Sequence, residues 1–125
     1  YLVMHVEYDD VRTQLPGVIA LKGEEFVYTP VQGQCVYVND EGAPSCLIGY
    51  YLADLGVPTS VFDELDGSYN YLEIDTVISH GLLDEWVTFS QDAIDALVEV
   101  QSGQDCFLSW GKSYSDVFEP TEDDK

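Results

Sequence analysis

The stretch SQDAIDALVEVQSG, residues 90–103, decides the expected fold of this chain, because it carries a complete helix signature. Ser90 is a strong N-cap residue, and Asp92 falls in the first turn, where the helix dipole favours a negative charge. Gly103 is expected to close the helix. Four residues recur at helical spacing and form the expected buried stripe, which is Ile94, Leu97, Val98 and Gln101.

Three acidic residues lie on another face of this helix, namely Asp92, Asp95 and Glu99. Their i, i+3 and i+7 spacing stacks them on one face opposite Ile94 and Val98, and successive members rise by roughly 4.5–6 Å. That rise matches the phosphate spacing of a nucleic-acid strand within about a factor of two. The stripe therefore predicts a surface that attracts a basic partner, by imitating a phosphate backbone. The alternative interpretation is a solvated face that keeps the protein soluble.

Other candidate partner-binding residues lie outside this helix. A second acidic cluster is Asp63, Glu64 and Asp66, and a third is Asp84 and Glu85 with Glu73 and Asp75 upstream. Tyr50 and Tyr51 are neighbours on a predicted helix, so both cannot face the core equally. Tyr50 is the candidate for an aromatic side chain that faces a partner.

The N-terminal half of the chain favours strands. Residues 1–8 are a possible strand, and Pro16-Gly17 is expected to break any helix over residues 9–22. Residues 25–29 (EFVYT) and 34–38 (QCVYV) are β-branched and aromatic, with a turn between them, so they predict a β-hairpin.

Helical patterns follow the hairpin. Pro44 near its first turn and Gly56 at its end bound one helix, and a short helix is expected from residues 59–60 to 65. Residues 70–83 fit a strand or a helix, of which helix is preferred here, and a last helix is expected from about Asp105. The prediction is an α+β fold with an N-terminal β-hairpin on about four short helices. Its parts are an N-terminal segment (1–24), a single globular domain (25–118) and an acidic flexible tail (119–125).

The charge of the chain excludes whole classes of partner. Twenty-four acidic residues face four basic ones, for a net charge of −20 in 125 residues. Between Lys22 and Lys112 the sequence has no Lys or Arg. Such a surface provides no general affinity for nucleic acid or anionic lipid, so the expected partner is a basic protein. Direct nucleic-acid and membrane contacts are not expected.

Enzymatic and metal sites are not favoured by the residue pattern. A nucleophilic pair of Cys46 and His80 lacks a family-type signature around either residue, and Cys46 is expected to be a small core residue. Zinc would need the scattered set Cys35, Cys46, Cys106 and His80. Three cysteines without C-x-x-C spacing predict no disulfide scaffold and a reducing cytoplasm. No cofactor and no metal are expected.

Several short segments resemble a known group of proteins. The segments are CVYVND (35–40), APSCLIG (43–49), LGVP (55–58), QD (104–105) and WG (110–111). Together they resemble small accessory proteins of actinobacterial tailed phages, with Asn39 where that pattern has His and an extra Glu41 before Gly42. The resemblance implies a phage protein in the cytoplasm of an infected bacterium, and it assigns no catalytic or binding residue.

Charge and resemblance together predict a non-enzymatic acidic phage protein. It would bind and inhibit or modulate a basic host protein, such as a nucleic-acid-binding or defence factor. Two alternatives stay open at this point. One is an immunity or antitoxin-type protein that neutralises a basic toxin, and the other is a virion structural or assembly protein.

Overall fold

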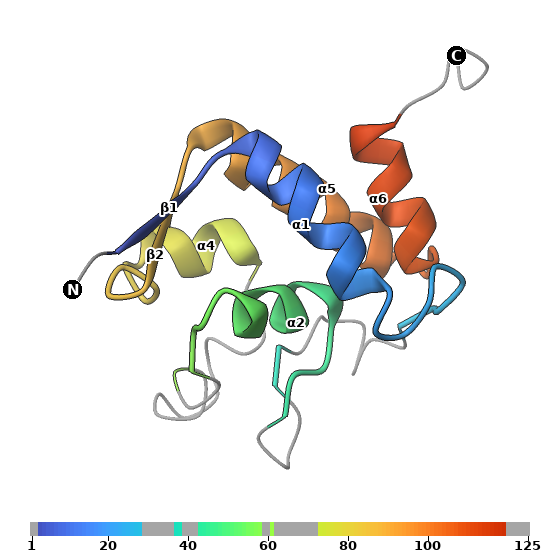
Figure 1. Ribbon diagram of the computed structural model, residues 1–125, viewed down its shortest axis with the longest axis horizontal. Helices are drawn as coiled ribbons and strands as arrows, with labels where there is room; N and C mark the ends of the chain where they lie inside the picture. The colour runs from blue at the N-terminus through green and yellow to red at the C-terminus, as the bar shows by residue number, and fades with distance from the viewer. Residues whose placement is uncertain (1–2, 29–36, 39–42, 59–60, 62–72, 120–125) are drawn as a thin grey trace.

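The computed structural model describes residues 3–28, 37–38, 43–58, 61 and 73–119. These residues form five helices and a two-stranded parallel sheet, a mixed α+β arrangement (Figure 1). The elements are β1 (Met4–Val6), α1 (Tyr8–Ile19), α2 (Leu47–Asp54), α4 (Ile74–Ser79), β2 (Val87–Phe89), α5 (Gln91–Asp105) and α6 (Trp110–Phe118). None of these helices has the length and apolar character needed to cross a membrane.

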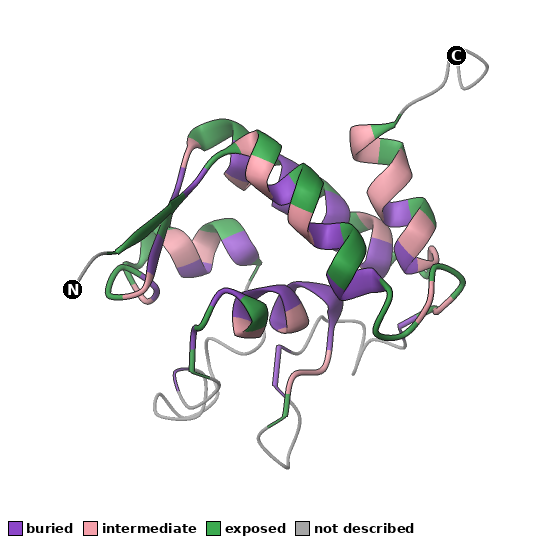
Figure 2. Ribbon diagram, viewed as in Figure 1, coloured by how far each residue is buried: buried purple, intermediate pink, exposed green. Residues whose placement is uncertain are grey.

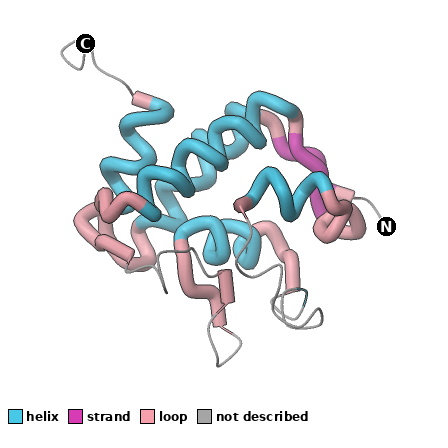
Figure 3. The backbone as a smooth tube through the Cα atoms, turned by 180° about the vertical axis from the view of Figure 1, so that it is seen from behind, coloured by secondary structure: helices cyan, strands magenta, loops and turns pink. Residues whose placement is uncertain are grey.

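The sheet pairs two segments that are far apart in the sequence. Strand β1 runs parallel to β2, with Met4 opposite Val87 and Val6 opposite Phe89. A single residue separates each strand from the helix that follows it. The two helices, α1 and α5, therefore lie side by side along the molecule (Figure 1). Seen from behind, the strand pair occupies one end of a largely helical body (Figure 3).

This sheet is not the N-terminal hairpin that the strand patterns predict. Val27 forms an antiparallel bridge with Ser109, and Val38 forms one with Pro44. Residues 29–36, which hold the turn and most of the second expected strand, lie outside the described residues. The strand that does pair, β1, finds its partner through long-range packing, which local alternation does not encode.

Helix α1 continues through Pro16, so the prediction that Pro16-Gly17 breaks a helix over residues 9–22 is wrong. Proline has no amide hydrogen, and the carbonyl oxygen of Arg12, four residues earlier, therefore loses its helical donor. The Tyr114 hydroxyl of α6 takes that place and donates to the Arg12 carbonyl oxygen at 2.6 Å. A side chain from the other end of the sequence thus compensates for the proline.

Helix α5 begins as predicted and ends later than predicted. The Ser90 hydroxyl accepts a hydrogen bond from the Ala93 amide at 3.2 Å, which confirms the N-cap. Gly103 lies inside the helix, where a Cβ would come 3.2 Å from the Ser113 hydroxyl oxygen, so the glycine permits close packing of α5 on α6. The left-handed position after the helix is instead taken by Phe107, whose φ is 68°. Helix α6 then starts at Trp110, with Ser109 as its N-cap, and not near Asp105 as predicted, because Asp105 is the last residue of α5.

The remaining helix predictions are confirmed in part. Helix α2 ends where Gly56 predicts, and Gly56 has the positive φ (97°) of a helix-ending glycine. The helix begins only at Leu47, because Pro44 lies before it, in the bridge to Val38, and not in its first turn. Helix α4 lies within residues 70–83 but spans only Ile74–Ser79. The short helix expected to end at residue 65 lies outside the described residues except for Val61, which is buried.

Two buried glutamines of α5 cap the starts of two other helices. Neither Cys46 nor Glu73, the N-cap residues of α2 and α4, supplies a side-chain cap. The amide oxygen of Gln104 accepts from the Leu47 amide at 2.7 Å, and that of Gln101 accepts from the Ile74 amide at 2.9 Å. Helix N-termini leave unpaired N–H groups that need such acceptors when buried. Gln104, in the QD segment at residues 104–105, therefore has a structural role.

The core lies between α1, α2 and α5, whose inward faces are buried (Figure 2). The buried face of α5 is rotated from the predicted stripe. Ile94 and Val98 are only partly buried, whereas Leu97 and Gln101 are buried as predicted. The rotation adds four residues to the buried face, which are Ala93, Ala96, Val100 and Gln104.

Candidate functional site

The acid stripe lines a groove on the surface of α5. Asp92, Asp95 and Glu99 are all exposed, and they border a hollow of about 400 Å³. The side chains of Tyr8, at the start of α1, and Val117, on α6, line the same groove, with Ala96 of α5. We call this the acidic groove. The sequence pattern identified its three carboxylates, but Tyr8 and Val117 come from elements that only the tertiary fold brings to α5.

The geometry of the stripe follows from the helix that carries it. The Ser90 cap fixes where α5 begins, and this places Asp92 in the first turn, beside the positive end of the helix dipole. Asp95 accepts a hydrogen bond from the Gln91 side-chain amide at 2.9 Å, which orients its carboxylate along the helix. The three carboxylates therefore form a regular row on a rigid element and not on a loop.

The positive charges of the described chain lie elsewhere. Arg12 pairs with Asp9 and Lys112 pairs with Asp116, and His5 Nε2 lies within hydrogen-bonding distance (3.0 Å) of Glu7 Oε1. The ammonium group of Lys22 lies over two aromatic rings, 5.5 Å from the centre of Phe26 and 5.8 Å from that of Tyr50. Among the described residues, no carboxylate of the stripe has an ionic partner. A cation from another molecule would thus compete with no cation of the described residues at the acidic groove.

The other predicted partner-binding residues do not join the acidic groove. Asp63, Glu64 and Asp66 lie outside the described residues. Tyr50 is partly exposed on α2, whereas its neighbour Tyr51 is fully buried, so the pair divides its faces as the helix geometry requires. The Tyr50 ring packs edge-on against Trp110 at a centroid distance of 5.8 Å, and it is absent from the lining of the acidic groove.

The states of the cysteines bear on whether one of them could be a nucleophile and on the cellular compartment of the protein. Cys46 is fully buried at the N-cap of α2, in agreement with its prediction as a core residue. It is disulfide-bonded, which the prediction of no disulfide scaffold and a reducing compartment did not anticipate, and in this state Cys46 cannot act as a thiolate nucleophile. Cys106 is free and exposed, and Cys35 lies outside the described residues. Disulfides are rare in reducing compartments, which weakens the argument for a cytoplasmic location.

Potential metal ligands are dispersed in the described part of the chain. No three His, Cys, Asp or Glu side chains there are grouped in a way that could hold a metal ion. A metal ion needs ligands that converge on one point. The stripe carboxylates are instead spread along a helix. The acidic groove is therefore suited to an extended basic surface better than to a single ion.

The chain matches no family model, and no curated protein or solved structure is significantly similar to it. The resemblance to actinobacterial phage proteins therefore stays a prediction.

Proposed function

We propose that this protein is a non-enzymatic binding protein whose acidic groove docks a basic partner protein. The observation that carries the proposal is the row formed by Asp92, Asp95 and Glu99. All three carboxylates are exposed on one face of a capped helix, and none has an ionic partner among the described residues.

The whole-chain charge supports the same partner chemistry. A net charge of −20 repels nucleic acids and anionic membranes and attracts basic proteins at long range. The rise between stripe residues, roughly 4.5–6 Å, suits a protein surface that normally contacts a phosphate backbone. The partner that we propose is therefore a nucleic-acid-binding or defence protein, which this protein inhibits or modulates by occupying its basic face. The phage resemblance supports a bacterial host as the source of that partner.

The experiment is an affinity capture with charge variants. Immobilised protein is exposed to actinobacterial lysate at about 50 mM and about 500 mM NaCl, because attraction between exposed charges is screened by salt. A captured protein is identified, purified and measured directly by titration calorimetry. The stripe variant is the triple substitution Asp92→Asn, Asp95→Asn and Glu99→Gln.

A control variant with the same change in charge separates the stripe from the overall charge. Asp9, Asp54 and Asp116 are exposed, lie outside the acidic groove and belong to none of the candidate acidic clusters, so Asp9→Asn, Asp54→Asn and Asp116→Asn serve as the matched triple. We expect the control to retain the partner and the stripe variant to lose it. Capture of no basic protein at low salt, or equal affinity of both triples, would contradict the proposal.

A further inference from the structure

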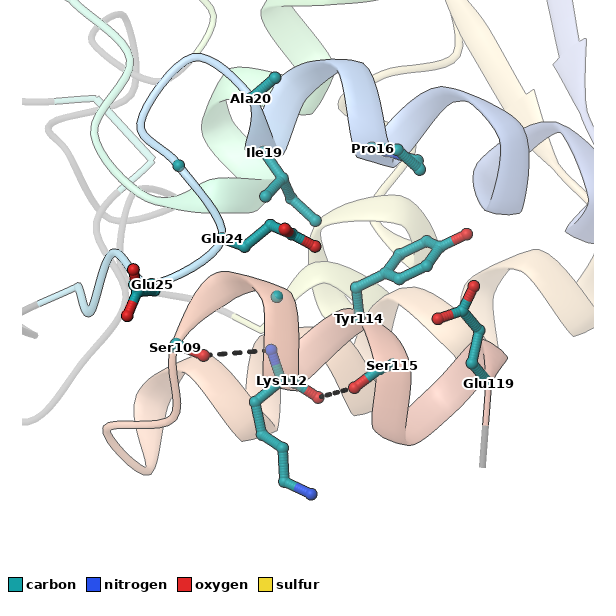
Figure 4. Close-up of a pocket in the computed structure, with 12 residues that line it drawn as sticks. Pro16, Ile19, Ala20, Glu24, Glu25, Ser109, Lys112, Tyr114, Ser115 and Glu119 are labelled. Carbon is teal, nitrogen blue, oxygen red and sulfur yellow. Dashed lines mark hydrogen bonds between the residues drawn. The ribbon is translucent and has the colours of Figure 1, made fainter. Parts of the chain in front are cut away.

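A second groove lies between α1 and α6, and it is larger than the acidic groove. It has a volume of about 790 Å³ and is lined on one side by Pro16 and Ile19 of α1 and on the other by Tyr114 of α6. Figure 4 shows these side chains directed toward the space between the two helices, with Glu24 beside them. The volume falls in the range of roughly 300–1,000 Å³ that is typical of ligand sites. We call this the α1–α6 groove.

Backbone packing holds one end of the α1–α6 groove in place. The Gly111 amide donates to the Glu24 carbonyl oxygen at 2.8 Å. A Cβ on Gly111 would come within 2.8 Å of the Glu24 Cβ atom, so only glycine permits this approach. The loop after α1 is thereby held against the start of α6, and the Glu24 side chain lies beside the groove (Figure 4).

The side chains of the α1–α6 groove offer both an apolar wall and negative charge. Pro16 and Ile19 provide aliphatic surface, Tyr114 provides an aromatic ring, and Glu24 and Glu119 provide carboxylates. Lys112 also lines the groove, but its ammonium group pairs with Asp116 at 2.8 Å and points away from the space in Figure 4. An aliphatic stem that ends in a cation matches this combination, because the stem packs on apolar surface while the charge meets carboxylates and a ring.

A run of aromatic rings connects the two grooves. Tyr8, which lines the acidic groove, lies 5.2 Å from Phe118 between ring centroids, and Phe118 lies 4.8 Å from Tyr114, which lines the α1–α6 groove. All three rings are partly exposed. A bound segment can therefore pass from one groove to the other across a continuous aromatic surface.

We propose that the α1–α6 groove receives a Lys or Arg side chain from an extended segment of the basic partner. The aliphatic stem of that side chain packs against Pro16 and Ile19, and its cation meets Glu24, Glu119 and the Tyr114 ring. The remainder of the segment crosses Phe118 and Tyr8 toward the acid stripe. This inference rests on the proposed function, and it identifies a peptide segment as the recognised element of the partner.

The test uses a defined peptide and the full chain. The probe is a short fluorescein-labelled peptide that alternates arginine with leucine, and a peptide with glutamine in place of each arginine is its control. Binding is followed by fluorescence anisotropy at about 50 mM NaCl, where exposed charge pairs are weakly screened. Two variants address the groove. Glu24→Gln with Glu119→Gln removes its carboxylates, and Ser115→Lys places a competing cation one helical turn from Glu119.

We expect each groove variant to weaken binding of the arginine peptide by about three- to tenfold, as for the loss of exposed charge pairs. The double variant Asp9→Asn with Asp54→Asn, which lines neither groove and has the same charge as the double groove variant, should bind within about twofold of the native chain. Thermal unfolding of each variant checks that the fold is intact. Groove variants that bind like the native chain, or native binding of the glutamine peptide as tight as of the arginine peptide, would overturn the inference.

The stripe variant separates the inference from the function on which it rests. If the Asp92, Asp95 and Glu99 triple variant loses the peptide while the groove variants retain it, the α1–α6 groove is wrong and the acidic groove stands. If the groove variants lose the peptide and the stripe variant retains it, the inference holds and the stripe is not the docking site. If all variants bind like the native chain, both fail.

Discussion

The hydrogen bond between the Tyr114 hydroxyl and the Arg12 carbonyl oxygen predicts an energetic coupling between α6 and the proline of α1. We expect Tyr114→Phe to destabilise the protein, because it leaves this carbonyl without a protein donor. The net contribution of one hydrogen bond is about 0.5–1.5 kcal/mol. For a chain of this size 1 kcal/mol corresponds to roughly 3–6 °C in Tm, so Tm should fall by about 2–9 °C.

Pro16→Ala tests whether the proline is the reason that Tyr114→Phe lowers the stability. Alanine restores the amide that donates to the Arg12 carbonyl oxygen inside α1. In this background Tyr114→Phe should cost about half as much or less, because the carbonyl now has a helical donor. The measurement is a double-mutant cycle, with urea unfolding of the native chain, both single variants and the double variant.

Tyr8→Phe is the control for this double-mutant cycle. Tyr8 belongs to the same run of aromatic rings as Tyr114, but its hydroxyl forms no hydrogen bond with the described residues, so Tyr8→Phe should change stability by less than about 0.5 kcal/mol. An equal cost of Tyr114→Phe with proline or alanine at position 16 would refute the compensation argument.

Four further substitutions test the packing and the burial of charge. Gln104→Leu should lower the free energy of unfolding by about 1–3 kcal/mol and speed hydrogen exchange at the Leu47 amide, which NMR would detect. Burial raises the pKa of Asp105, so ionisation disfavours the folded state, and Asp105→Asn should raise Tm at neutral pH. That gain should disappear as the pH falls below the ordinary carboxyl pKa, because the native acid is then protonated in both states. Gly111→Ala should lower Tm, since a Cβ there meets backbone and side-chain atoms within 3 Å, whereas Gly17→Ala in α1, with open space around it, should keep or raise Tm.

Local signals in the sequence predicted the elements that depend on neighbouring residues. Ser90 caps α5 and Gly56 ends α2 as expected, because both act within a few residues of their own positions. The same local rules failed at Pro16 and Gly103. At Pro16 the Tyr114 hydroxyl of α6 replaces the lost helical donor, and at Gly103 the missing Cβ leaves room for the Ser113 side chain of α6.

Strand β2 was missed by the sequence reasoning, although a signal for it exists. Residues 86–89 read WVTF, which are all β-branched or aromatic. Three residues are too few for alternation to decide a strand. Its pairing with β1, across more than eighty residues of sequence, depends on the packing of the helices that follow each strand.

The sequence by itself determined the charge of this protein and the exposure of its acid stripe. Asp92, Asp95 and Glu99 follow from helical spacing on a capped helix, and the absence of Lys and Arg between positions 22 and 112 follows from composition. Only the tertiary structure decided that the stripe lines a groove with Tyr8, and that a second groove opens between α1 and α6. The physical reason is that spacing along a chain defines which face a residue occupies. What stands opposite that face depends on contacts between distant segments.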